Sequence, residues 1–280
     1  MSTTASTNFK TEFDSLVKHA YQGESKLMGK IRTRANVNAK TYEFPKMGKG
    51  IATLRIPQTD VLPMNVAHSK ATVTLLDYDA SDYSAVEDLD KLAFDEKMEL
   101  VKIVSMAIGR RIDQAVIDAM AASAFANQVG INIGGTNTSL NVEKITLAHQ
   151  YLTANGVPME GRTMLINAQA LRNALLETEI ASSDFNVVRA LSTGEIKKYA
   201  GFDFVVIEDR DEGGVPLATT NQRNCFAFHK DSVGLAMTGG VRSSVDWIAE
   251  KKSWLITSAV TLGATTIDTN GVIDVLTYEA

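Results

Sequence analysis

Residues 26–99 separate their charges into a basic segment and an acidic segment that follows it. The basic side chains are Lys26, Lys30, Arg32, Arg34, Lys40, Lys46, Lys49 and Arg55. The acidic side chains are Asp77, Asp79, Asp82, Glu87, Asp88, Asp90, Asp95, Glu96 and Glu99. A chain that groups its charges in this way either pairs them within one molecule or brings them together across a contact between molecules.

Two extended runs in this region predict a long β-hairpin over residues 41–78. The first run contains a Gly-Lys-Gly turn signal at 48–50, Pro57 and Pro63 then interrupt the chain, and the second run alternates apolar and polar residues. Such a hairpin projects away from any core, and its unpaired edges are an aggregation liability unless another surface covers them. We therefore expect this hairpin to lie on a second copy of the chain.

The charge separation suggests how two copies meet. We hypothesise that the basic hairpin of one copy lies on the acidic segment and helix of the next, a head-to-tail contact that closes into rings. Surface ion pairs are worth about 0–1 kcal/mol each, so charge would set the register and apolar burial would supply most of the binding. The candidate interface residues are Arg32, Arg34, Lys46, Lys49, Arg55, Asp88, Asp90, Glu96 and Glu99. Pairing of these charges within one chain is the alternative.

A long amphipathic helix is the clearest regular element of the sequence. Residues 95–125 place apolar side chains at the spacing of one helical face, with acidic residues at the start of the helix. A shorter amphipathic helix is predicted over residues 9–20, and residues 129–140 form a loop rich in Gly, Asn and Thr that indicates a boundary.

The remainder of the chain predicts an α/β region followed by antiparallel strands. Asn141 is expected to cap a helix that runs through Ala154. The other predicted elements are strands at 163–167, 202–207 and 225–228, a helix at 168–176, and a tail of strands over 241–278 with turns at Gly263 and Asn270-Gly271. The fold class is therefore α+β.

Composition and motifs exclude several classes of protein. The apolar fraction of 45% and the net charge of -5 exclude disorder over the bulk of the chain. With one cysteine and four scattered histidines, the sequence forms neither an intrachain disulfide nor a Cys/His zinc cluster, and Cys225 lies in an apolar strand. The glycines at 130, 134 and 135 lack the Gly-Lys-Ser/Thr ending of a phosphate loop, and no Gly-x-Ser-x-Gly elbow occurs. We predict no enzyme, cofactor or metal, and no membrane segment, because no run approaches ~20 apolar residues.

The order of these parts resembles the major capsid protein of tailed bacteriophages. Three phrases carry the local resemblance: FAFHKDSVGLAM at 226–237, GATTIDTNGVIDVLTY at 263–278 and KYAGFDFVVIED at 198–209. The resemblance implies the phage major-capsid fold, with an N-terminal arm, an extended β-hairpin loop, a long spine helix, a peripheral domain and an axial α/β domain. The implied bounds are 1–40 for the arm, 41–80 for the loop, 81–128 for the peripheral domain with its spine helix, 129–242 for the axial domain and 243–280 for the return strands of the peripheral domain.

The resemblance also implies a function and partners. The chain would assemble with itself into pentamers and hexamers of an icosahedral shell that encloses double-stranded DNA without binding it specifically. A scaffolding protein, a portal protein and a decoration protein are the implied partners, and assembly would take place in the host bacterial cytoplasm. Some members cross-link a lysine of the extended loop to a neighbour; Lys46 and Lys49 lie in that element, although solvated lysines are the favoured interpretation.

Three other functions stay open from the sequence. An encapsulin-type nanocompartment would use the same fold to hold protein cargo in place of a genome. An α/β enzyme of unknown reaction would need a pocket with converging titratable groups, which the sequence does not display. A monomeric binding module would sediment as a single small species.

Overall fold

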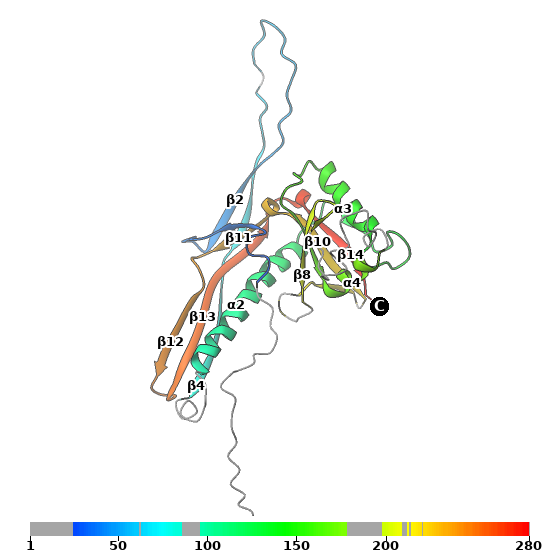
Figure 1. The fold of residues 1–280 in the computed structure, drawn as a ribbon. Coiled ribbons are helices and arrows are strands. Elements are labelled where there is room, and N and C mark those ends of the chain that lie inside the picture. The colour runs from blue at the N-terminus through cyan, green and yellow to red at the C-terminus, as the bar shows by residue number, and fades with distance from the viewer. Residues whose placement is uncertain are drawn as a thin grey trace, which may run out of the picture.

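The computed structural model describes residues 25–61, 63–85, 96–177, 198–208, 212, 214–219 and 221–279. Within these ranges the chain is α+β and forms an elongated body from which one hairpin projects (Figure 1). The helix predicted at residues 9–20 lies outside the described residues, as do Asp88 and Asp90.

A five-stranded sheet and one long helix form the elongated part of the body (Figure 1). The strands are β1 (Arg32–Arg34), β4 (Leu76–Ala85), β11 (Val233–Met237), β12 (Arg242–Ile248) and β13 (Ser253–Thr266). β13 is central and pairs with β11, β12 and β4, all antiparallel. Helix α2 (Glu96–Ala121) packs along one face of this sheet.

Helix α2 confirms the long helix that the sequence predicts. Val104, Ile108, Ile112 and Val116 recur at helical spacing and are buried. They face the sheet, where the buried cluster includes Val260 and other residues of β11 and β13. The pairing of a helical stripe with alternate residues of a strand is what fixes the helix against this face.

A seven-stranded sheet with two helices forms the second part. Its strands are β5 (Gln128–Val129), β6 (Arg162–Asn167), β7 (Lys198–Tyr199), β8 (Phe202–Ile207), β9 (Leu217–Thr219), β10 (Gln222–His229) and β14 (Val272–Tyr278). Its helices are α3 (Val142–Ala154) and α4 (Ala168–Leu176). The predicted strands and both helices are confirmed, including the cap at Asn141, whose side chain accepts a hydrogen bond from Lys144 N at 2.8 Å.

Alternate residues of β6 show that the seven-stranded sheet contributes to two buried clusters, one on each of its faces. Met164 and Ile166 are buried in the cluster that contains α3 and α4, whereas Leu165 is buried in the cluster that contains α2. The seven-stranded sheet is therefore buried on both faces, which explains why all six residues of β6 are buried.

The C-terminal tail differs from the prediction in two ways. β13 runs without a turn through Gly263, and the last strand, β14, pairs with β10 in the seven-stranded sheet, whereas β12 and β13 lie in the other sheet. The crossing occurs at a 3-10 turn, Thr269–Gly271, beside a matching turn at Lys230–Ser232. A Cβ at Gly271 would lie 1.8 Å from Ser232 Oγ, so a glycine is needed where the two crossings touch. The assignment of domain bounds along the chain stays a prediction.

Gly263 has a packing role in place of the predicted turn. A Cβ at this position would lie 2.3 Å from the carbonyl oxygen of Thr74 and 2.8 Å from Val73 Cγ2. Glycine in a strand interior often marks a site of close backbone approach. Here it lets the end of β3 (His68–Thr74) cross closely over β13.

The predicted hairpin is present, although its reversal lies farther along the chain. β2 (Thr41–Met47) and β3 pair antiparallel, from Thr41 opposite Thr74 to Met47 opposite His68. The Gly-Lys-Gly segment at 48–50 continues outward, and the chain reverses at 57–59, where Gln58 has a φ of 64° and Thr59 N donates to Ile56 O at 3.4 Å. Proline at position 57 suits such a turn because its φ is preset.

Candidate assembly surfaces

The base of the hairpin, residues 41–47 and 68–75, is anchored on its own molecule. Phe44 is 1% exposed and packs with Val73 and Leu75 in a small buried cluster that includes Ala236. A Cβ at Gly234 would lie 2.7 Å from the Phe44 ring, so the glycine of β11 leaves the space that the ring fills. The expectation that the whole ribbon lacks a place on its own molecule is therefore wrong for the base.

Ion pairs within the chain also hold the base. Lys46 Nζ donates to Asp268 Oδ1 at 2.8 Å, and Lys70 Nζ donates to Glu43 Oε1 at 2.6 Å. Partial burial alone would raise the pKa of the Asp268 carboxyl, but hydrogen bonds from Lys46 and Asn270 lower it below its ordinary value. Lys46, a candidate interface residue from the sequence, thus has its partner in the same molecule.

The tip of the hairpin, residues 50–66, has the opposite character. It extends away from the body with no other segment beside it (Figure 1). Ile51 is 80% exposed and Leu54 is 93% exposed. The other large apolar side chains exposed on the described part of the tip are Ile56, Val61 and Met64. An apolar surface of this kind on a projecting arm indicates a protein contact.

The remaining candidate interface residues lie in different places. Arg32 and Arg34 are exposed on β1, and the Arg32 guanidinium lies 6.0 Å from the Phe44 ring centroid. Lys49, at the foot of the tip, donates to Asn155 O at 3.0 Å, whereas Arg55 is exposed on the tip. The pairing of these basic groups with the acidic candidates across a contact between copies stays a prediction.

Among the four acidic candidates, Glu99 is the one whose side chain the structure describes. Glu99 pairs with Lys102 on the same helix at 2.9 Å. Glu96 begins α2, but its side chain is outside the described part of the chain, as are Asp88 and Asp90.

Acidic residues on the open face of the five-stranded sheet were not among the candidates. Tyr78 and Ala80 of β4 pack toward α2, so Asp77 and Asp79, which alternate with them, are exposed on the opposite face. Asp77 accepts from Thr261 Oγ1 at 2.6 Å. The alternation of acidic and apolar residues at 76–80 is the sequence signal for this face, and it becomes readable once β4 is known to be a strand.

A buried carboxylate attaches the N-terminal segment to the spine helix. Asp113 of α2 is fully buried and accepts hydrogen bonds from Ser25 Oγ at 2.8 Å, Lys26 N at 2.9 Å and Leu27 N at 3.2 Å. Leu27 is buried beside it. Residues 25–27, which lie within the predicted N-terminal arm, are thus fixed to their own molecule, and no local sequence pattern indicated this role for Asp113.

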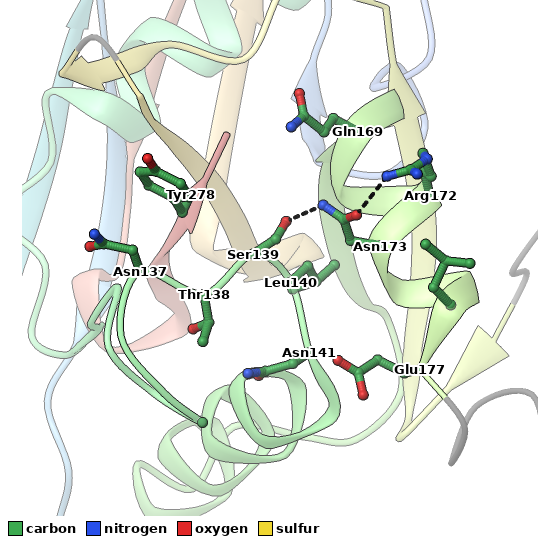
Figure 2. Close-up of a pocket in the computed structure, with 12 residues that line it drawn as sticks. Asn137, Thr138, Ser139, Leu140, Asn141, Gln169, Arg172, Asn173, Glu177 and Tyr278 are labelled. Atoms are coloured by element: carbon green, nitrogen blue, oxygen red, sulfur yellow. Dashed lines mark hydrogen bonds between the residues drawn. The ribbon is translucent and has the colours of Figure 1, made fainter. Parts of the chain in front are cut away.

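A polar pocket of about 520 Å³ lies between the 134–141 loop, α4 and Tyr278 (Figure 2). Asn173 Nδ2 donates to Ser139 Oγ at 2.7 Å across it, and Arg172 Nη1 donates to Asn173 Oδ1 at 3.3 Å. Its lining consists mainly of amides and hydroxyls, with Arg172 and Glu177 as its charged residues. This lining does not bring several titratable groups together at one point, as the pocket of an enzyme would.

Two buried titratable groups lie in the same part of the molecule, Lys144 on α3 and Cys225 on β10. Lys144 Nζ donates to Thr138 O at 2.6 Å and Leu276 O at 2.8 Å, and burial lowers the pKa of its amine to about 8. Burial raises the pKa of the Cys225 thiol to about 11, so this cysteine is a poor nucleophile. Both groups support the core.

The described residues contain neither a side-chain group suited to binding a metal ion nor a helix suited to crossing a membrane. Among them, no group of three His, Cys, Asp or Glu side chains is arranged to bind a metal ion. Within the same part of the chain, no helix combines the length and hydropathy that crossing a bilayer requires.

Comparisons with known proteins agree on one family. The family described as Phage capsid protein matches residues 5–279. No curated protein sequence matches significantly. Among solved structures, the capsid of the cyanophage P-SCSP1u is similar with a TM-score of 0.77 and 15% identity, over 98% of this chain and 94% of that chain.

Two further structures are similar over nearly the full length. The capsid of Helicobacter pylori bacteriophage KHP30 has a TM-score of 0.77 and 11% identity, over 97% of this chain and 96% of that chain. Mycobacterium phage Che8 gives a TM-score of 0.69 and 13% identity, over 97% and 98%. At such identities the structural likeness establishes the fold, which is that of phage major capsid proteins. The family match over residues 5–279 establishes the family to which the chain belongs. The chain therefore belongs to the phage capsid protein family, and it is a self-associating structural component of the virion shell and not an enzyme.

Proposed function

We propose that copies of this chain form pentamers and hexamers that tile an icosahedral shell around double-stranded DNA, with the hairpin tip of each copy lying on the adjacent copy. The observation that carries this proposal is the contrast within one ribbon, whose base is buried and whose tip exposes Ile51 and Leu54. A contact of this type is heterologous, and a rotation between copies closes it into a ring.

Magnitudes favour the apolar side chains of the tip as the main source of binding. Complete burial of a side chain such as Leu54 or Ile51 contributes about 1.5–3 kcal/mol. An exposed ion pair, such as one made by Arg55, contributes about 0–1 kcal/mol. Several buried apolar groups are therefore needed to exceed the entropic cost of association, and Arg55 serves mainly to select the register.

The charge balance supports a shell that encloses DNA without binding it tightly. The net charge is -5, and exposed acidic groups such as Asp77 and Asp79 occupy the open face of the sheet. DNA binding depends on neutralising phosphates with Lys and Arg. Arg242 lies on this face beside Asp77 and Asp79, and the negative charge of these two carboxylates opposes phosphate binding there. A scaffolding protein, a portal protein and a decoration protein are the further partners that we propose from the resemblance of the chain to tailed-phage capsid proteins.

Sedimentation velocity and electron microscopy of the full chain, alone and with its candidate scaffolding protein, test this function. Wild-type protein should form pentamers, hexamers or closed shells. The Ile51→Ser/Leu54→Ser double variant should remain folded but lose most assembly. Leu217→Ser, which removes an apolar side chain that is 55% exposed on β9, is the control and should assemble normally. A wild-type chain that stays monomeric under all these conditions would refute the proposal.

A further inference from the structure

The backbone of the tip is extended but is not paired across its two arms. Among the described residues of the tip, backbone hydrogen bonding is confined to the turn, where Thr59 N donates to Ile56 O; below the tip, Gly48 N donates to Ala67 O at 2.8 Å. The returning arm explains this. Pro63 has no amide hydrogen, and Asn65 has a φ of 45°, which is incompatible with a strand. The outgoing arm, residues 50–56, contains no proline and therefore keeps its backbone donors for another partner.

The five-stranded sheet has a strand edge without a backbone partner among the described residues, at β12. β12 pairs with β13 along one side and, among the described residues, has no strand along its other side, so it is one of the edge strands of the sheet. Six of its seven residues are exposed. A strand edge of this length is normally covered, blunted or paired, because its open donors and acceptors bind other chains.

The two faces of β12 differ in chemistry. Val245 and Trp247 are 42% and 44% exposed, and Trp247 packs on Trp254 with ring centroids 5.4 Å apart, on the face that carries α2. Ser244 and Asp246 alternate with them on the other face, together with Arg242, and Ser244 Oγ donates to Asp246 Oδ2 at 2.8 Å. The edge thus presents an apolar side and a polar side on which Asp246 carries the negative charge.

The outgoing arm of the tip also has two different faces. A strand over 50–56 places Leu54 and Ile56 on one face, whereas Arg55 lies on the other face together with Ile51 and Thr53. Setting Leu54 and Ile56 beside Val245 and Trp247 places Arg55 on the side of Asp246. The reverse arrangement would set Arg55 against the exposed aromatic and aliphatic groups and leave Asp246 beside leucine and isoleucine.

We propose that residues 50–56 of one copy add as a strand to the free edge of β12 in the adjacent copy, with Leu54 and Ile56 on the Val245 side and Arg55 on the Asp246 side. This inference rests on the proposed function, because it requires copies that meet head to tail. Strand addition supplies main-chain hydrogen bonds for affinity, and the alternating side chains select the register.

Amide hydrogen exchange on wild-type shells, compared with unassembled protein, tests the pairing directly. Residues 50–56 and 242–248 should both exchange at least about tenfold more slowly in shells, because ladder amides are protected. Intact shells in which either segment exchanges at the unassembled rate would overturn the strand addition and leave the proposed function standing. A chain that forms no shell at all would overturn both.

Neighbouring proline variants provide a matched pair. Successive amides of a strand point to opposite edges, so one of Ala52→Pro and Thr53→Pro removes a ladder donor and the other removes a donor that faces away. We expect one variant to raise the protein concentration needed for assembly at least about tenfold more than the other. Equal effects of the two variants would contradict a backbone ladder at this segment.

Cysteine pairs test which side chains of the added strand lie on the Asp246 side of β12. Thr53→Cys combined with Ser244→Cys or with Asp246→Cys places both thiols on one face, and a pair that the register sets directly opposite falls within the 4.4–6.8 Å Cα separation that a disulfide accepts. Ala52→Cys with the same β12 variants is the control, because its side chain lies on the other face. Oxidised shells should yield covalent multimers from Thr53→Cys and few from Ala52→Cys. Equal yields would refute the facing, and if these variants fail to assemble, the exchange measurement on wild-type shells decides.

Discussion

At its base the hairpin buries Phe44 and Val73 against its own sheet, whereas at its tip the same ribbon holds Ile51 and Leu54 in solvent. The base and residues 51–56 of the outgoing arm of the tip both contain β-branched residues, and residues 51–56 contain no proline, so local propensity does not separate these two segments. The difference lies in what each can reach: the base lies over β11 and β13, where Gly234 makes room for it, and the tip extends past the end of the body (Figure 1). The base is part of the folding unit, and the tip is available to a neighbour.

The largest effect on the unassembled chain should come from Phe44→Ala. Removing this fully buried ring leaves a cavity beneath the hairpin, and such substitutions cost about 3–5 kcal/mol. Chemical denaturation of the unassembled protein measures the loss of unfolding free energy. A loss below about 1 kcal/mol would mean that the base is not anchored as the structure indicates.

Glycine substitutions should give the second largest difference in unfolding free energy between the base and the tip. Gly263→Ala forces a methyl group against the Thr74 backbone and should destabilise the chain by about 1–3 kcal/mol. Gly50→Ala is the matched variant on the tip, where the nearest atom is the movable Met64 sulfur at 3.0 Å. That variant should change the unfolding free energy by less than about 0.5 kcal/mol. Equal losses from the two substitutions would remove the distinction.

The Lys46–Asp268 pair should give a small effect with a defined dependence on pH. The pKa of Asp268 is lowered in the folded chain, so its contribution is present above the ordinary carboxyl pKa and is lost as pH falls through the lowered value. Because both side chains are about one third exposed, solvent screening limits the contribution to about 0.5 kcal/mol. Unfolding free energies of wild type and Lys46→Met should differ at pH 6 and converge in acid, and a constant difference would contradict the pairing.

The smallest effect on the unassembled chain should come from Leu54→Ser at the tip. The side chain is exposed, so its replacement should change the unfolding free energy by less than about 0.5 kcal/mol. The same variant should nevertheless weaken assembly in light scattering, because about 1.5–3 kcal/mol of burial is lost at each contact. A variant that unfolds more easily and assembles normally would invert the comparison.

Local sequence signals predicted the elements well. The helical stripe through Ile108 and Ile112 predicted α2, and Asn141 predicted the start of α3 through its capping side chain. These signals depend on residues close together in the chain, where spacing and capping chemistry are sufficient.

Long-range packing produced the differences from prediction. Gly263 looks like a turn residue, yet it lies within β13 because Thr74, distant in sequence, passes over it. The sequence also did not indicate that Asp113 would bind the amides at Lys26 and Leu27, or that Lys46 would find Asp268. Candidate interface residues chosen by charge alone therefore included groups that are satisfied within one chain, while the apolar tip carries the stronger signal.

Electron cryo-microscopy of shells assembled from the wild-type chain most directly tests whether the tip is completed by a neighbour. We expect the density for residues 50–66 to lie against the adjacent copy, with Leu54 buried and residues 41–47 unchanged on their own molecule. Shells in which the tip stands in solvent or folds back onto its own body would contradict this account.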